Sequence, residues 1–357
     1  MKKNIFTVML TLAISAAVVS AGGRADARTL GWRELYAALL KEKSAPETEY
    51  PDTADAFSLY DLNSDGVPEL ILSHGDYHGA YCTVYTVSGG ELKKVLDLGS
   101  YGTCLYRSTG CLAGSYMGMG YTDINYYSIA DDYKEYMSFS DNSGTAEREI
   151  YFTVNNKEVT KEEYEKELAG MQSGTGIELG RTYMINDDSI KYAVTGVKNY
   201  KTAYSGILKD SYLSSPYHND DERYTLMDIT GDRTPELIVY AGKMDIYTFT
   251  RGRAQLIATE YPDTQHGSIT VGYSFDRKML IVSSGTEDGK SADSCYSIRR
   301  GRIKCEGILS QNSTDKTYRI DENTVSKDEY EKAKKKYAGR RVYYGTVYDL
   351  NEENIKL

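Results

Sequence analysis

The chain has 357 residues, with 42 basic residues against 52 acidic ones and a formal net charge of −10. This acidic balance argues against nucleic acid as a partner, because phosphate binding requires a basic surface. A hydrophobic content of 40% and the presence of 34 tyrosines argue against a disordered chain, and the length allows about two domains of ordinary size.

The N-terminal segment has the pattern of a secretory signal peptide. Lys2 and Lys3 precede an apolar run over residues 5–21, and small residues follow up to Ala27. A basic start, an apolar middle and a small-residue cleavage site are typical of export signals. The run contains hydroxyl residues and is short for a membrane span. We therefore expect residues 1–27 to be a signal peptide and the mature chain to be secreted, extracellular and without a membrane span.

The first predicted element of the mature chain is an amphipathic helix. Trp32, Leu35, Tyr36, Leu39 and Leu40 share one face at helical spacing. Short runs rich in Tyr, Val, Ile and Thr follow and are separated by turn signals, which predicts an antiparallel meander. The clearest of these runs are Leu70–Ser73, Tyr81–Val87, Leu92–Leu98 and Asn125–Ile129.

A second helix with a distinct start follows these strands. Thr160 and Glu163 are spaced as a capping box, and so are Ser326 and Glu329. Tyr164, Leu168 and Met171 would form the buried stripe of the helix that begins after Thr160.

A long internal repeat organises these elements. Asp61–Leu70 aligns with Asp228–Leu237 at an offset of 167, with five of ten positions identical. Other blocks match in the same order at nearly the same offset: Trp32 and Tyr36 with Tyr200 and Tyr204, 158–167 with 324–333, and 180–191 with 345–356. The period is too long for a solenoid unit. We therefore expect an α+β fold of two tandem homologous modules, residues 28–195 and 196–357, each an antiparallel β-meander with flanking helices.

The segment 61–69 carries the first part of a calcium-binding loop. Oxygen-bearing side chains occupy alternate positions, a glycine allows the sharp turn, and a backbone carbonyl and a further acid follow. A hard cation prefers such a set of oxygens. The candidate ligands are Asp61, Asn63, Asp65, the Val67 carbonyl and Glu69. Position 12 is Leu72 and a strand-like run follows, so the loop is not an EF-hand. The same side chains also form such turns without metal.

With its neighbours, the stretch Tyr60–Leu72 (YDLNSDGVPELIL) resembles the calcium loop and following strand of FG-GAP/VCBS-type repeats, the integrin-α-like class. It is also similar to loops of uncharacterised secreted bacterial proteins. The resemblance implies a hairpin loop that holds Ca2+ through the same five residues, in an extracellular protein that binds other molecules. One motif per 167 residues is sparser than in a propeller of that class, which does not favour a propeller here.

The second copy of the loop is less suited to a cation. Thr230 stands where the first copy has Asn63, and Arg233 stands where it has Gly66. The remaining acids, Asp228, Asp232 and Glu236, either bind a metal weakly or hold the turn through hydrogen bonds, and the sequence leaves both open.

Two further groups of residues have alternative interpretations. His74, Asp76 and His78 could converge on zinc, although a loop with two solvated histidines is the simpler interpretation; the other histidines are His218 and His266. The five cysteines, Cys82, Cys104, Cys111, Cys295 and Cys305, either form disulfides in an exported protein or remain reduced.

The motifs of common hydrolases and nucleotide-binding proteins (G-x-S-x-G, H-E-x-x-H and the Walker loop) are absent from the sequence. Tyrosines cluster at 116, 121, 126 and 127, and tyrosine suits binding surfaces. We therefore expect a bacterial-type binding or adhesion module with a calcium-stabilised loop and an unknown extracellular ligand, a glycan or a protein. An extracellular hydrolase acting on glycans or peptides, and a structural or inhibitory protein, are the alternatives.

Overall fold

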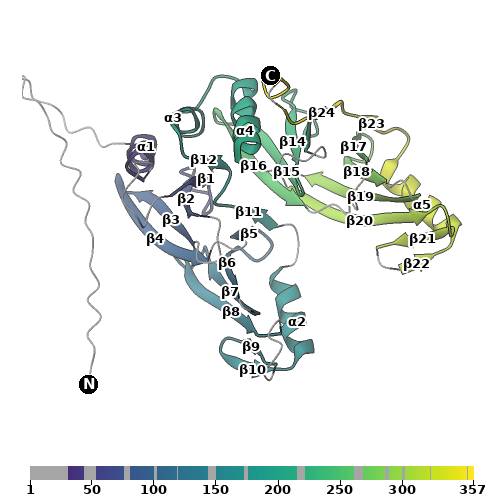
Figure 1. The fold of residues 1–357 in the computed structure, drawn as a ribbon, viewed down its shortest axis with the longest axis horizontal. Helices are drawn as coiled ribbons and strands as arrows, with labels where there is room; N and C mark the ends of the chain where they lie inside the picture. Colours follow the sequence, from purple (N-terminus) through teal and green to yellow (C-terminus); the bar gives the residue numbers. More distant parts are fainter. Residues whose placement is uncertain are drawn as a thin grey trace, which may run out of the picture.

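The computed structural model describes residues 31–43, 54–75, 81–99, 103–118, 120–143, 150–172, 176–214, 222–260, 268–285, 289–299, 302–321, 323–351 and 353–357. The expected signal peptide lies outside these residues. The described chain folds mainly into four antiparallel sheets, accompanied by short helices (Figure 1). The expectation of antiparallel strands is confirmed. The α+β class is wrong in its helical share, because many Ser- and Thr-rich segments without clear apolar alternation also form strands.

A five-stranded sheet begins the first half of the chain. Four strands form a meander, and the last strand of this half returns to pair with the first, in the order β12-β1-β2-β3-β4. Phe57 of β1 thus lies beside Leu72 of β2 on one side and Tyr183 of β12 on the other. The strands are β1 (Ala56–Tyr60), β2 (Glu69–His74), β3 (Tyr81–Ser88), β4 (Glu91–Gly99) and β12 (Tyr183–Met184).

A seven-stranded sheet completes the first half in the order β10-β9-β8-β7-β6-β5-β11. The two sheets lie close together where β4 meets β6. A Cβ atom placed on Gly114 of β6 would lie only 2.9 Å from the Leu98 Cβ of β4, so glycine is needed at this position. The strands are β5 (Cys104–Tyr106), β6 (Cys111–Gly118), β7 (Tyr121–Ser128), β8 (Lys134–Asp141), β9 (Phe152–Val154), β10 (Lys157–Val159) and β11 (Gly176–Glu178).

The second half has two sheets with the same connectivity. Their orders are β24-β13-β14-β15-β16 and β22-β21-β20-β19-β18-β17-β23. The strands of the first are β13 (Arg223–Met227), β14 (Glu236–Tyr240), β15 (Met244–Thr250), β16 (Arg253–Glu260) and β24 (Val347–Asp349). Those of the second are β17 (Ser268–Ser274), β18 (Met279–Gly285), β19 (Lys290–Arg299), β20 (Arg302–Asn312), β21 (Thr317–Ile320), β22 (Asn323–Val325) and β23 (Tyr343–Tyr344).

The helices cover parts of these sheets. They are α1 (Trp32–Lys43), α2 (Lys161–Met171), α3 (Asp187–Ser189), α4 (Tyr200–Ser214) and α5 (Lys327–Ala338), with a π-helical segment η1 (Ile190–Thr195) before α4. The stripe expected on α1 is confirmed, since Leu35, Tyr36, Leu39 and Leu40 are buried. Among the described residues, none of the helices combines the length and the apolar character needed to cross a membrane.

Both expected capping boxes are present. The Thr160 hydroxyl accepts a hydrogen bond from the Glu163 amide, and the Glu163 carboxylate accepts one from the Thr160 amide at 3.0 Å. Ser326 and Glu329 make the same reciprocal pair at the start of α5. These bonds satisfy amides that a helix leaves without an internal partner.

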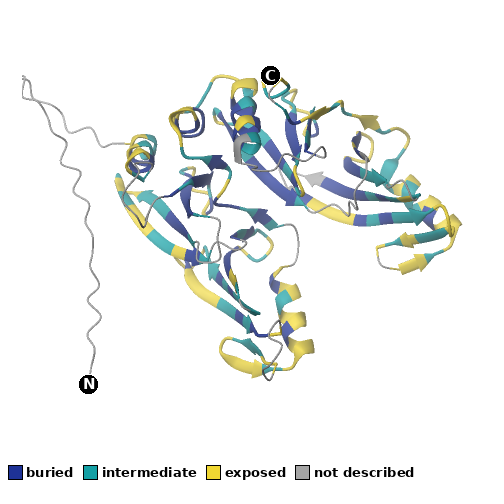
Figure 2. Ribbon diagram, viewed as in Figure 1, coloured by how far each residue is buried: buried dark blue, intermediate teal, exposed yellow. Residues whose placement is uncertain are grey.

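A single hydrophobic cluster joins the two halves. It contains buried residues of α1 and the first sheet together with Tyr247, Leu256 and other residues of the second half. The Tyr183 hydroxyl crosses the junction and donates to the Ala254 carbonyl at 2.6 Å. Buried residues concentrate near this junction, whereas the far strands β10 and β22 are largely exposed (Figure 2).

Candidate functional site

The loop that joins β1 to β2 is folded by its own side chains. Asp61 Oδ2 accepts a hydrogen bond from the Gly66 amide (3.1 Å). Asn63 Oδ1 accepts one from the Asp65 amide (3.0 Å), and Asp65 Oδ1 accepts one from the Val67 amide (2.7 Å). The three side chains at alternate positions therefore turn back onto the backbone of the loop, as Asp and Asn side chains also do in turns without metal.

One oxygen of this loop is left without a partner. Asp61 Oδ1 is buried and makes no hydrogen bond among the described residues. A buried carboxylate oxygen without a partner is costly, and a cation would satisfy it. Asp65 Oδ2 accepts only an exposed bond from the Asn63 amide group at 3.1 Å. Asp61 Oδ1 and Asp65 Oδ2 are therefore the oxygens of the loop that remain available to a cation, whereas Asn63 Oδ1 and Asp65 Oδ1 already accept backbone amides.

Glu69, the fifth candidate ligand, lies inside the protein. Its side chain is fully buried, with Oε2 accepting from the Leu62 amide (2.8 Å) and Oε1 from the Thr86 hydroxyl (3.2 Å). Burial raises the pKa of Glu69 to about 7, although the Leu62 and Thr86 hydrogen bonds oppose the shift. These contacts favour a role in fixing the base of the loop over direct contact with an ion.

The second half builds the corresponding loop with different hydrogen bonds. Asp228 Oδ1 accepts from the Gly231 amide (2.6 Å), and Oδ2 accepts from the Arg233 amide (3.0 Å). The Thr230 hydroxyl turns inward and donates to Glu236 at 3.2 Å. Both oxygens of Asp228 are thus engaged by the chain itself, and the loop has no equivalent of the unpartnered Asp61 oxygen.

The two loops share two positions in the left-handed backbone region. In the first loop these are Ser64 and Gly66, with φ of 64° and 89°. In the second loop they are Gly231 and Arg233, with φ of 82° and 73°. Each loop therefore has glycine at one of these positions and a strained residue at the other, so Arg233 does not prevent the turn.

A buried tyrosine supports each loop from a helix of its own half. The Tyr36 hydroxyl donates to the Pro68 carbonyl at 2.9 Å. The Tyr204 hydroxyl donates to the Pro235 carbonyl at the same distance. Both prolines precede the strand that leaves the loop, so each tyrosine fixes the same point of the backbone.

An arginine from the second half reaches the first loop. Arg251 lies in the turn between β15 and β16, and its Nη1 donates to the Gly66 carbonyl at 3.3 Å. The same nitrogen lies 3.8 Å from Asp61 Oδ2. Because the arginine side chain is 61% exposed, we expect its attraction to Asp61 to be weak. The contact still places the candidate cation loop at the junction of the halves.

The expected histidine cluster is described only in part. His74 is buried, stacks on the Tyr81 ring at 4.2 Å and lies 3.3 Å from the Thr83 hydroxyl. Asp76, His78, His218 and His266 lie outside the described residues. Within the described ranges, no three His, Cys, Asp or Glu side chains are arranged to hold a metal.

The cysteines are free thiols in the described chain. Cys104 pairs with Ala113 across the β5–β6 hairpin, and a bulge places Tyr296 opposite Cys305 in the β19–β20 hairpin. The registers of these two hairpins therefore do not place the two cysteines of either hairpin opposite one another.

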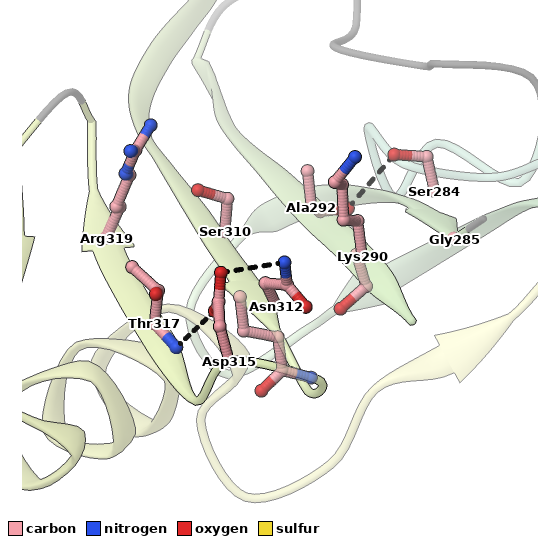
Figure 3. A pocket seen from close by; sticks show the side chains of 11 residues that line it. Ser284, Gly285, Lys290, Ala292, Ser310, Asn312, Asp315, Thr317 and Arg319 are labelled. Atoms are coloured by element: carbon pink, nitrogen blue, oxygen red, sulfur yellow. Dashed lines mark hydrogen bonds between the residues drawn. The ribbon is translucent and has the colours of Figure 1, made fainter. Parts of the chain in front are cut away.

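A polar groove lies at the tip of the second seven-stranded sheet. It encloses about 390 Å3 and is lined mainly by hydroxyl and amide side chains of β18 to β21. Figure 3 shows Asp315 bonded to Asn312 and to the Thr317 amide, with Lys290 and Arg319 on either side. No described aromatic side chain lines this groove, so it has no platform on which a sugar ring would stack.

Exposed aromatic residues gather elsewhere on the second half. Phe275 is 51% exposed and lies 5.0 Å from the Tyr343 ring. Arg341 lies over the Tyr343 ring at 4.5 Å, and Tyr344 is 65% exposed. We call Phe275, Tyr343 and Tyr344 the aromatic patch. In the tyrosine cluster expected from the sequence, Tyr116 is exposed but Tyr126 is fully buried.

The junction between the halves forms a polar cleft. Two adjoining cavities of about 240 and 180 Å3 share Arg181, Lys243 and Asp245 among their lining residues. Lys243 forms an ion pair with Glu178 and lies 3.6 Å from Asp245. Lys243 is therefore neutralised by two acids of the cleft itself.

Comparison with known proteins does not identify this chain. No protein-family model matches it, and a search of the curated proteins finds no match.

Proposed function

We propose that the chain is an exported binding protein made of two copies of one β-rich unit, and that the loop between β1 and β2 binds Ca2+. The observation that carries the calcium assignment is the buried Asp61 oxygen without a hydrogen-bond partner. Export is inferred from the basic and apolar N-terminal segment of the sequence.

The duplication is supported by contacts that recur at corresponding places. Each loop rests on a buried glutamate, Glu69 or Glu236, that accepts the amide of the second loop residue. Each glutamate also accepts a threonine hydroxyl from the following strand. Together with the paired tyrosines and the matching strand orders, these contacts favour descent of the halves from one ancestral unit.

The calcium assignment applies to the first loop alone. Asp61 offers a buried, unpartnered oxygen, whereas both oxygens of Asp228 accept amide hydrogen bonds. The duplicated loop therefore provides an internal comparison. It has the same backbone path, but its own hydrogen bonds replace the bonds that an ion would make.

A binding function is supported by the aromatic patch. Solvent-exposed aromatic rings beside an arginine are typical of surfaces that hold a partner. The patch lies on the second half, far along the chain from the calcium loop. We therefore assign the loop a stabilising role and place ligand contact on the second half.

The calcium assignment can be tested by thermal unfolding of the metal-stripped protein in Ca2+, Mg2+ or chelator. Calcium at 100 times its dissociation constant stabilises a folded protein by about 2.7 kcal/mol. We expect the melting temperature to rise with Ca2+ and to return to its starting value with chelator. The absence of a calcium-dependent rise in the wild-type protein would overturn the assignment.

Two matched variants locate the ion. Asp61→Asn keeps one oxygen for the Gly66 amide but replaces the other with an amino group that cannot bind calcium, so it should abolish the rise. Asp228→Asn makes the same change in the second loop and should leave the rise intact. Equal rises in both variants would place the ion elsewhere.

A further inference from the structure

A cavity of about 420 Å3 lies between helix α5 and the second seven-stranded sheet. Its walls include Ile281, Leu309, Val342 and Tyr337, with Asp293 and Lys334 as its charged residues. Tyr344 of the aromatic patch also lines it, so the cavity opens beside exposed aromatic surface. Cavities of this size that combine apolar walls with a few polar groups are typical of small-molecule sites.

The corresponding place in the first half holds larger, aromatic side chains. The β7–β8 ladder has a bulge after Tyr126, and the β19–β20 ladder has a bulge after Cys295. Tyr126 also pairs with Ala113 of β6, just as Cys295 pairs with Ile281 of β18. These two registers place Cys295 where the first half has Tyr126.

A second aromatic ring is missing from the same region. In the β7–β8 ladder, Ile124 pairs with Phe139 two residues before the bulge that follows Tyr126. In the β19–β20 ladder, Asp293 pairs with Leu309 two residues before the bulge that follows Cys295. Phe139 packs 5.7 Å from the Tyr126 ring and is 1% exposed. The second half therefore has a thiol and a leucine where the first half packs two aromatic rings.

The charged residues of the cavity also replace apolar ones. Lys334 follows Tyr330 by four positions in α5, as Leu168 follows Tyr164 in α2. Lys334 Nζ lies 3.5 Å from Asp293 Oδ2, with the aspartate side chain only 17% exposed. A partly buried ion pair in place of an isoleucine and a leucine is a poor source of stability. Its presence beside a cavity is better explained by contact with a polar ligand atom.

Cys295 forms part of the wall and is not a reactive group. Its side chain is 1% exposed, and the thiol donates to the Asp293 carbonyl at 3.7 Å. Burial raises its pKa to about 12, so the thiol stays neutral and adds a small apolar surface to the cavity.

We propose that this cavity binds a small, neutral aromatic molecule that carries a hydroxyl or amide group. The ring fills the space that Tyr126 and Phe139 occupy in the first half, and the polar group lies at the Asp293–Lys334 pair. A neutral group that both donates and accepts matches such a pair. A charged group would meet a like charge on one side. The proposal rests on the binding function proposed above but not on the calcium loop.

Isothermal titration and ligand-observed NMR on the full mature chain test the proposal with four probes: p-cresol, benzamide, toluene and glucose. We expect saturable binding of p-cresol or benzamide, weaker binding of toluene and no binding of glucose. If none of the three aromatic probes binds saturably, the proposal is overturned.

Two double variants separate the ring from the polar group. Cys295→Tyr with Leu309→Phe introduces the two aromatic rings of the first half into the cavity, and it should lower the affinity for all aromatic probes by about tenfold or more. Asp293→Ile with Lys334→Leu restores the apolar pair of the first half. It should weaken p-cresol about tenfold, the change expected for a lost hydrogen bond to a charged group, and leave toluene unchanged. If the filled variant does not fold, the ratio of p-cresol to toluene affinity in the second variant decides the question, and an unchanged ratio overturns the proposal.

The calcium loop supplies the independent control. Asp61→Asn should lose the calcium-dependent rise in melting temperature and keep the affinity for p-cresol. In the wild-type protein, probe binding without any calcium response would overturn the calcium assignment alone. A calcium response without probe binding would overturn the cavity proposal alone.

Discussion

The hydroxyl groups of Tyr36 and Tyr204 should contribute equally to stability, because they make the same contact in the two halves. Each is fully buried. Tyr36 donates to the Pro68 carbonyl at 2.9 Å, with a second carbonyl at 3.3 Å. Tyr204 donates to the Pro235 carbonyl at 2.9 Å, with a second carbonyl at 3.4 Å. Phenylalanine at either position keeps the ring and removes only the donor.

The expected magnitude follows from the burial of both hydroxyls, of which one donates to buried Pro68 and the other to half-buried Pro235. A hydroxyl has one hydrogen, so each tyrosine makes one full hydrogen bond at a time. Its removal loses that bond and leaves a buried or half-buried carbonyl without this donor, which costs about 1–3 kcal/mol. The two hydroxyls share no hydrogen-bond acceptor, so the losses in the double variant should add within about 0.5 kcal/mol.

Denaturant unfolding measures both losses. The single tryptophan, Trp32, lies 5.7 Å from the Tyr36 ring and reports on its surroundings by fluorescence, while circular dichroism follows the whole chain. Tyr136→Phe is the control, because that side chain is 57% exposed and should change stability by less than about 0.5 kcal/mol. A loss at one tyrosine and none at the other would refute the structural equivalence of the two loops.

Two further changes test the junction. Lys243→Met should lower the free energy of unfolding by about 2 kcal/mol, because Glu178 and Asp245 lose their shared cation in a partly buried site. Lys304→Met removes the lysine of a surface ion pair and should change the free energy of unfolding by less than about 0.5 kcal/mol. Equal losses in the two variants would contradict a stabilising role for Lys243 at the junction. Burial raises the pKa of Asp210 above its ordinary value of 3.8. Between 3.8 and the folded pKa, the folded state keeps a proton that the unfolded state has lost. The free energy of unfolding should therefore fall as the pH rises through this range. Asp210→Asn should remove that part of the pH dependence in denaturant titrations from pH 4 to 8, and an unchanged slope would contradict it.

The sequence predicted the features that local signals encode. The buried stripe of α1 and the two capping boxes were found because their residues lie within a few positions of one another. The strands β2, β3 and β4 match runs of β-branched and aromatic residues between turns. The loop hydrogen bonds of Asp61, Asn63 and Asp65 likewise follow from their alternation.

The features that the sequence did not predict depend on residues far apart in the chain. Arg251 reaches Gly66 across 185 positions, and nothing near either residue marks the contact. The burial of Glu69 was missed because an acid at that position of a metal loop favours a ligand role over a structural one. The cavity beside Asp293 depends on distant strands, whose registers place Cys295 at the position that Tyr126 has in the first half.

The returning strands bear on how the chain folds during synthesis. The first half can complete its five-stranded sheet once β12 has left the ribosome, because β12 pairs with β1. The second half waits until Val347–Asp349 has been made, because β13 has β24 as its outer neighbour. A nascent chain therefore passes through a stage in which a finished first half precedes an open β13 edge, and open edges invite pairing with another chain. Exchange of β24 between two molecules would be the corresponding misfolding route.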